Sequence, residues 1–189
     1  MLSSEHRVGR LEHIEVLRLC HDVGDSLQPL LKKHRVTLRV RGDEVCVRTD
    51  SGIVKGALIN LIQNACVHGY GPWDPMTQSP NITRVIDVEV SESANVIHTG
   101  VQLSVVDFGV GIPLELHERI FEPFYTTARG RGGTGLGLHL VYSTIQGVLE
   151  GQLKLESELG RGSRFTLTLP TLEITPVPEV EEYGEESSS

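Results

Sequence analysis

The sequence has no apolar run approaching the roughly 20 residues that span a bilayer, and Met1–Arg10 carries charge with no apolar segment after it. Both absences favour a soluble, cytoplasmic segment without membrane contact, and a membrane anchor elsewhere in a longer parent protein is compatible with them. The sequence also has no dense cluster of Lys and Arg, and its formal net charge is −8. We therefore expect no contact with nucleic acid.

Cysteine is scarce, and the three cysteines stand far apart at Cys20, Cys46 and Cys66. An odd number of cysteines with no CxxC pair indicates neither a disulfide framework nor a zinc site. This usage is typical of a protein in a reducing compartment.

The composition is that of a globular protein: 189 residues, 39% hydrophobic and 22% charged, with 20 glycines. This length accommodates one ordinary domain with flanking segments. We expect a helical lead-in over residues 1–34, the domain proper over 35–170, and an acidic linker or disordered tail over 171–189, where Pro, Glu and Ser dominate.

Hydrophobic periodicity predicts an α+β fold, a two-layer sandwich in which a mixed, mainly antiparallel sheet packs on helices. Residues 10–34 show helical spacing, interrupted at Gly24 and Pro29. The other expected helices cover residues 53–67 and 136–146, and the expected strands cover residues 36–40, 45–47, 85–90, 101–107, 151–157 and 163–170. A turn around Gly42-Asp43 joins the first two strands.

Asn60 and Asn64 lie four residues apart in the helix predicted over residues 53–67. Their side chains therefore project from one helix face, where two amide oxygens could reach one cation. Mg²⁺ takes oxygen ligands and usually only one or two from protein, the others coming from phosphates and water. The alternative is that both amides simply hydrogen-bond loop backbone.

The string DFGVG places Asp107 at the end of a hydrophobic strand and Gly109 and Gly111 in the turn after it. A fixed carboxylate can accept a hydrogen bond from an exocyclic amine such as that of adenine, and glycine lets a ring or phosphate approach the backbone. A tight bend with no binding role is the alternative.

The third pattern is GGTGLG, residues 132–137, at the start of an amphipathic helix. Backbone N–H groups and the positive end of the helix dipole favour phosphate at such a position. The spacing is neither that of a dinucleotide fingerprint nor that of a Walker phosphate loop, which needs a lysine. A flexible glycine-rich loop without a ligand is the alternative.

Four ordered strings, NLIQNACVHG, DFGVGIP, FEPFYTT and GGTGLGLHLV, resemble the N, G1, F and G2 boxes of histidine kinase catalytic domains and cover roughly residues 53–142. The resemblance implies binding of ATP and Mg²⁺, with a glycine-rich ATP lid. It implies that Asn60 and Asn64 hold Mg²⁺ and act in catalysis and that Asp107 binds adenine. Phe121 and Phe124 would anchor the lid, although one of the two is expected to be a core aromatic. The other implied nucleotide contacts are Gly109, Gly111, Ile112, Gly133, Thr134, Gly135, Leu136 and Gly137.

The same resemblance places His68 near the ribose and phosphates, one turn after Asn64. Arg129 and Arg131 lie in the expected lid, where a permanently charged guanidinium could contact the polyphosphate. Val67 stands where the family often carries a basic residue, so one phosphate contact is missing or is supplied by the lid.

The resemblance implies phosphoryl transfer from ATP to a histidine on a dimeric helical hairpin, and then a response-regulator receiver domain as partner. The acceptor motif HExxxP does not occur here, and His21 lies too close to Asn60 to be the acceptor. Two alternatives stand beside this function: a nucleotide-binding regulatory module without catalysis, and an ATPase of the gyrase or chaperone type. Those hydrolases use a glutamate where this chain has Asn60, and an amide cannot act as a general base.

Overall fold

The computed structural model describes residues 11–71, 83–95, 98–127, 134–170 and 174–176. Its main sheet has five strands in the order β2-β4-β5-β7-β6, and β2 pairs in parallel with β4 while the other three pairings are antiparallel. The strands are β2 (Val36–Gly42), β4 (Arg84–Asn95), β5 (His98–Asp107), β6 (Gln152–Glu158) and β7 (Gly162–Pro170). A mixed, mainly antiparallel sheet confirms the predicted fold class.

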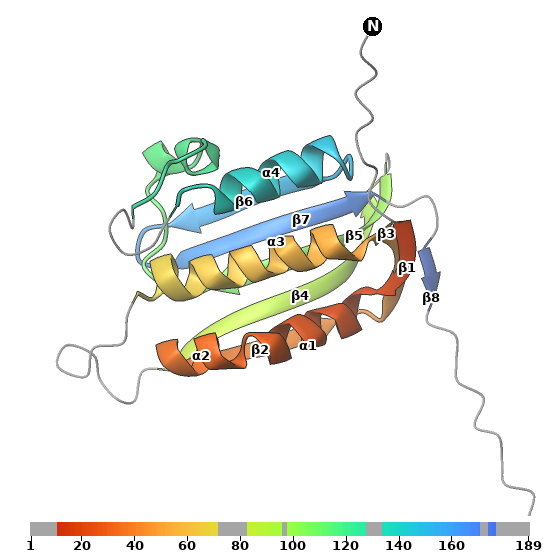
Figure 1. Ribbon diagram of the computed structural model, residues 1–189, viewed down its shortest axis with the longest axis horizontal. Coiled ribbons are helices and arrows are strands. Elements are labelled where there is room, and N and C mark those ends of the chain that lie inside the picture. Colours follow the sequence, from red (N-terminus) through yellow and green to blue (C-terminus); the bar gives the residue numbers. More distant parts are fainter. Residues whose placement is uncertain (1–10, 72–82, 96–97, 128–133, 171–173, 177–189) are drawn as a thin grey trace, which may run out of the picture.

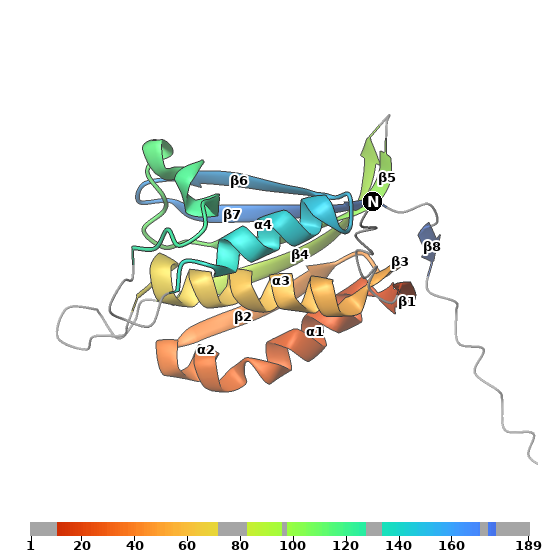
Figure 2. The ribbon, with the colours of Figure 1, turned by 45° about the horizontal axis from the view of Figure 1, so that its top comes forward.

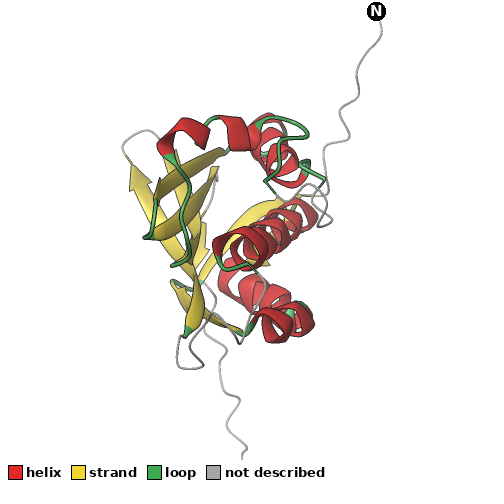
Figure 3. Cartoon of the chain, turned by 90° about the vertical axis from the view of Figure 1, so that its left-hand side faces the viewer, coloured by secondary structure: helices red, strands yellow, loops and turns green. Residues whose placement is uncertain are grey.

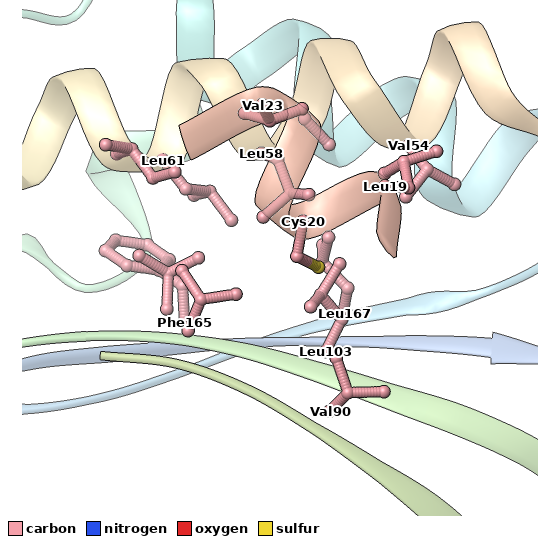
Figure 4. Close-up of a cluster of buried hydrophobic side chains, with 14 of the residues drawn as sticks. Leu19, Cys20, Val23, Val54, Leu58, Leu61, Val90, Leu103, Phe165 and Leu167 are labelled. Carbon is pink, nitrogen blue, oxygen red and sulfur yellow. The ribbon is translucent and has the colours of Figure 1, made fainter. Parts of the chain in front are cut away.

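In the described residues, the α-helices lie on one face of this sheet and form the second layer (Figures 1 and 3). They are α1 (Val16–Ser26), α2 (Gln28–His34), α3 (Ser51–Asn64) and α4 (Gly137–Gly147). The core lies between the layers, where side chains of α1 and α3 meet inward-facing side chains of the strands (Figure 4). None of the helices in this described part is long and apolar enough to cross a membrane.

The helix start at α3 is fixed by Asp50, whose Oδ1 accepts a hydrogen bond from the Ile53 N–H at 3.1 Å. Such a cap satisfies one of the N–H groups that have no partner within the helix. From there, α3 runs through the centre of the helical layer, and Leu58 and Ile62 on it are fully buried. This confirms the helix predicted from residue 53.

The helical segment expected over residues 10–34 is divided differently from the prediction. Residues 11–15 form a strand, β1, and Gly24 lies inside α1 rather than at a break. The break is at Leu27, just before Pro29 in the first turn of α2. A side chain at Gly24 would place its Cβ 2.7 Å from Leu38 on β2, so glycine allows α1 to approach the sheet closely.

The structure has a second, three-stranded sheet that the sequence analysis did not predict. Its order is β1-β3-β8, with β1 (Leu11–Glu15) and β8 (Ile174–Pro176) each antiparallel to β3 (Val45–Asp50). The strands predicted at 36–40 and 45–47 are both present, but they belong to different sheets. Residues 11–15 were expected in the helical lead-in and residues 174–176 in the acidic linker or disordered tail, but both form strands. The reason is that β3 offers backbone partners on both edges, which no local pattern reveals.

The sheet face opposite the helices carries cross-strand ion pairs. Arg39 binds the buried Asp87 through two hydrogen bonds of 2.6 and 2.8 Å, and Glu89 accepts from both Arg41 and Arg164. These partners lower the pKa of Glu89. Apolar and polar residues thus alternate along the strands, as expected for a sheet with helices on one side.

Candidate functional site

A cavity of about 590 Å³ opens where the C-terminal end of α3 meets the N-terminal end of α4. Both helix ends lie at the same end of the sheet as the loop after β5 (Figures 1 and 2). The volume is in the range of small-molecule sites. Of the residues predicted to bind a ligand, the cavity wall includes Asn60, Asn64, His68, Asp107, Gly111, Ile112, Thr134, Gly135 and Gly137.

The two asparagines of α3 are in contact with each other. Asn64 Nδ2 donates a hydrogen bond of 3.0 Å to Asn60 Oδ1, as their spacing on one helix face predicts. Within the described residues, these amides bond to each other rather than to loop backbone. This bond uses neither Asn64 Oδ1, which is an acceptor, nor Asn60 Nδ2, which is a donor.

The helix does not end at Asn64 but widens into a π-helical turn, η1 (Ala65–Gly69), which the Tyr70 N–H closes on the Ala65 carbonyl at 3.0 Å. Turns of this kind are rare and occur often at functional sites. The wider turn brings Gly69 to the loop after β5, where its carbonyl accepts a hydrogen bond of 2.9 Å from the Val110 N–H. The helical pattern of the sequence gives no sign of it.

Asp107 ends β5 at the inner wall of the cavity and is 4% exposed. The Gly109 N–H donates to its Oδ1 at 2.9 Å. Burial raises the pKa of Asp107 to about 6, although hydrogen bonds from Gly109 and Ser163 stabilise the charged form and oppose the rise. At neutral pH it is therefore an ionised, poorly solvated acceptor that gains from a donor on a bound ligand.

Glycines let the loop after β5 pass between η1 and the turn joining β6 to β7. A Cβ at Gly69 would lie 2.8 Å from Asp107 Oδ1, and a Cβ at Gly109 would overlap the backbone of Gly69. Gly111 has a φ of 71°, and a Cβ there would overlap the Glu158 carbonyl. Gly109 therefore lies behind the cavity wall, where it packs on Gly69, whereas Gly111 is in the wall itself.

The two phenylalanines of the F box have different surroundings. Phe121 packs on Tyr142 with ring centroids 5.2 Å apart and meets the edge of Phe165 at 6.5 Å, so it is the packed aromatic of the pair. Phe124 is 64% exposed, has a φ of 64° and lies outside the cavity wall. Its backbone would lie 2.5 Å from a Cβ at Gly135, so Gly135 packs directly on the Phe124 backbone.

At the base of the expected lid, a side-chain hydrogen bond of 3.1 Å joins Thr127 Oγ1 to His68 Nδ1 on the π-helical turn. On the other side, the Leu136 N–H lies 3.4 Å from Thr134 Oγ1 just before α4. Leu136 itself is not part of the cavity wall. Arg129, Arg131 and Gly133 lie outside the described residues.

Residues 49–173 match the family described as "Histidine kinase-, DNA gyrase B-, and HSP90-like ATPase". The chain belongs to this family. The sensor kinase CckA of Brucella abortus is 35% identical over 133 residues, which are 67% of this chain and 13% of that protein. The sensor-like histidine kinase SenX3 of Mycolicibacterium smegmatis is 28% identical over 212 residues, covering 98% of this chain and 49% of its own length. The chain thus spans half or less of the length of these two relatives.

Among solved structures, the nucleotide-free catalytic domain of histidine kinase ThkA has a TM-score of 0.69 at 27% identity, covering 86% of this chain and 98% of that domain. ThkA in complex with response regulator protein TrrA has a TM-score of 0.68 at 26% identity, covering 89% of this chain and 44% of that one. The fold is therefore that of a histidine kinase catalytic domain.

The family's nucleotide and metal can be tested against the residues at the α3–α4 junction. Gly137 opens α4 directly against the asparagine pair, and a Cβ there would lie 2.8 Å from Asn60 Oδ1. This close approach puts the first turn of α4, with its N–H groups, beside two oxygen-bearing amides. Helix N-terminal N–H groups suit phosphate and amide oxygens suit Mg²⁺, so the residues present fit both groups.

Sequence reasoning missed two residues that shape the surroundings of Asp107. Tyr70 holds the loop after β5 through its hydroxyl, and Ser163 on β7 faces Asp107 across the strand pair. Ser163 could have been found from the expected pairing of residues 101–107 with 163–170, because the two strand ends then lie opposite each other. Tyr70 carried no signal, since it follows the helix in a segment rich in Gly and Pro.

Proposed function

We propose that this chain is the ATP·Mg²⁺-binding catalytic domain of a two-component sensor histidine kinase, which transfers the γ-phosphoryl group to a histidine on a helical hairpin outside this chain. The observation that carries the proposal is that one cavity has two chemically different ends. A buried carboxylate, Asp107, lies at one end, and the bonded pair Asn60 and Asn64 lies against the first turn of α4 at the other.

At the adenine end, Asp107 would accept a hydrogen bond from the exocyclic amine. A charged acceptor in a poorly solvated position contributes about 1.5–3 kcal/mol to such a bond. Guanine presents a carbonyl oxygen at the corresponding ring position, so the same carboxylate would repel it. Asp107 thus accounts for both affinity and base selectivity.

At the phosphate end, Asn64 and Asn60 would hold Mg²⁺ through amide oxygen, and the first turn of α4 would face the phosphates. When bound, Mg²⁺ supplies neutralisation of the charge on the phosphate oxygens. The chain's own residues then fix the position of the γ-phosphoryl group, and positioning is the main contribution that a protein makes to this reaction. Neither asparagine can activate water as a base, which favours transfer over hydrolysis.

We propose that the acceptor histidine lies in a segment outside this chain and that a response-regulator receiver domain is a further partner. His21 is exposed on α1, and no residue of α1 belongs to the cavity wall among the described residues. The likeness to ThkA, which was solved with the response regulator protein TrrA, supports a receiver domain as the second partner. Unpaired Cys20 and Cys66, both buried, are compatible with work in the reducing cytoplasm.

The test combines calorimetry with a transfer assay. The chain should bind ATP with Mg²⁺ present and lose most of that affinity with EDTA. With labelled ATP, it should leave itself unlabelled and transfer phosphate slowly to an added acceptor hairpin from a related sensor kinase, since the missing covalent link lowers the effective concentration. A His21→Ala variant is the control for self-labelling.

Each alternative function has its own outcome in this assay. Tight ATP binding without transfer to any hairpin would indicate a regulatory module. Release of inorganic phosphate by the chain alone, at a rate lost in Asn60→Ala, would indicate a hydrolase. Acid-labile label on the chain that disappears in His21→Ala would show that the acceptor is inside it.

A further inference from the structure

The loop that carries Asp107 is held by consecutive backbone bonds. The Phe108 N–H donates to the Tyr70 hydroxyl at 3.0 Å, the Gly109 N–H to Asp107 Oδ1 at 2.9 Å, and the Val110 N–H to the Gly69 carbonyl at 2.9 Å. Two of these three acceptors belong to Gly69 and Tyr70, at the end of the π-helical turn. Tyr70 supplies the acceptor for Phe108, the residue that directly follows Asp107 in sequence.

The Tyr70 hydroxyl uses its full hydrogen-bonding capacity at this point. It donates to the Val85 carbonyl on β4 and accepts from the N–H groups of Val85, at 3.3 Å, and Phe108. One donor and two acceptor positions are all that a phenol has. Burial raises the pKa of Tyr70, so the hydroxyl keeps the proton it needs to donate. The phenol therefore links the first residues of β4 to the first residue of the adenine loop.

The ring of Tyr70 is fixed independently of its hydroxyl. The Arg84 guanidinium lies over the ring, 5.6 Å from its centroid, and Arg84 is 4% exposed. Arg84 Nη1 donates to the carbonyls of His34 and Gly71, each at 3.1 Å, and thereby ties the end of α2 to the segment after Tyr70. Because the ring is placed by these contacts, removing only the oxygen should leave the packing intact.

We propose that Tyr70 is a positioning residue for base recognition: its hydroxyl fixes the Phe108 N–H and so sets where the Asp107 carboxylate meets the exocyclic amine of the nucleotide. The proposal rests on the proposed function, since it assumes that the amine is adenine's. It predicts a division of labour within the cavity. Tyr70 should affect recognition of the base and leave the contacts with the phosphates unchanged.

The test compares Tyr70→Phe with Tyr142→Phe, a matched loss of a hydroxyl from a ring that packs on Phe121 and is not part of the cavity wall. The ligands are ATP and purine riboside triphosphate, which lacks the amine, each with Mg²⁺. Tyr70→Phe should bind ATP about tenfold more weakly, as expected for one displaced hydrogen bond. Its affinity for the amine-free nucleotide should stay within about twofold, and Tyr142→Phe should match the parent with both ligands. In a double variant with Asp107→Asn, the Tyr70→Phe loss should disappear.

Equal weakening of both nucleotides would show a merely structural role and overturn the proposal, as would unchanged ATP affinity. Hydrogen exchange without nucleotide provides a second test that does not depend on ATP binding. The Phe108 amide should exchange slowly in the parent, although its residue is 57% exposed, and at least about tenfold faster in Tyr70→Phe. Fast exchange in the parent would overturn the proposal even if the variant failed to fold. A parent that binds no nucleotide but shows this protection pattern would refute the proposed function and leave the positioning of the loop confirmed.

Discussion

The two ends of the cavity are built in opposite ways. At the end proposed to bind adenine, Asp107 is 4% exposed, and the loop after it is bonded to the Gly69 carbonyl, to the Tyr70 hydroxyl and to the turn between β6 and β7. At the end proposed to bind the phosphates, the described residues include a side-chain bond between Asn60 and Asn64 and another between His68 and Thr127. The first end is therefore fixed by bonds to the backbone of its loop, whereas these contacts of the second end are between side chains.

Under the proposed function, this difference predicts how base recognition and metal binding are divided between the two ends. A preformed base site lowers the cost of ordering on binding. Side chains at the end proposed to bind the phosphates can rotate to meet the ligand geometry that Mg²⁺ and phosphate oxygens would require. Substitutions at the phosphate end should therefore remove activity, and substitutions at the adenine end should change selectivity and stability.

The largest effect is expected from Asn64→Ala. Water would replace the lost amide oxygen, so one fewer protein ligand would hold Mg²⁺, and ATP affinity with Mg²⁺ should fall about 100-fold, equivalent to roughly 2.7 kcal/mol. Affinity with EDTA should stay near that of the parent, because base recognition is at the other end. Calorimetry with and without Mg²⁺ measures both, and an unaltered Mg²⁺ dependence would remove Asn64 from the metal site.

Asp107→Asn should show opposite effects on binding and stability. The amide can present its NH₂ to the adenine amine, so ATP affinity should drop by about 10- to 100-fold. The apo protein should become more stable at pH 7 by about 1–3 kcal/mol, because the variant no longer carries a buried charge whose pKa is raised to about 6. Thermal melting at pH 7 measures the second effect. A lower melting temperature would show that the carboxylate is needed for the fold.

In the unmodified chain, changing the pH should separate the effects of Asp107 on stability and on ATP affinity. Folding raises the pKa of Asp107 from 3.8 to about 6, so the folded state holds the proton more tightly. The contribution of Asp107 to stability should therefore decline as pH rises from about 4 to 6 and stay level above. ATP affinity should rise about tenfold between pH 5 and 8, as the acceptor becomes charged. Asp107→Asn is the control, and a pH dependence that survives in it would come from another group.

The smallest effect concerns the start of α4. In Gly137→Ala, the added Cβ would press on the Asn60 amide, and we expect a several-fold loss of Mg²⁺-dependent ATP affinity with a small loss of stability. Gly147→Ala at the other end of the same helix is the matched control, since nothing lies within 4 Å of its added Cβ. That variant should bind ATP normally and gain up to about 1 kcal/mol in stability. Equal behaviour of the two variants would show that the contact with Asn60 is unimportant.

The sequence predicted those parts of the fold and site that local rules govern. Alternation revealed β4, β5 and β7, and helical spacing placed Asn60 and Asn64 on one face, where the structure has them bonded. The π-helical turn was not predictable, because it depends on Gly69 meeting a loop some forty residues later in the chain. For the same reason, β1 was assigned to a helix. Its pairing with β3 is a long-range contact, and Ile14 alone does not distinguish a strand from a helix turn.

The small sheet also sets the distance between the first and last strands of this domain. β1 and β8 flank β3 on its two edges, so they lie about 10 Å apart across the sheet. Leu11 pairs with Asp50 and Pro176 with Val45, which offsets the start of β1 from the end of β8 by five residues, or about 17 Å along the strands. The separation is then about 20 Å, which a flexible linker of about a dozen residues spans. A circular permutant joined at this point, with new ends opened between β2 and β3, would keep every element that forms the cavity.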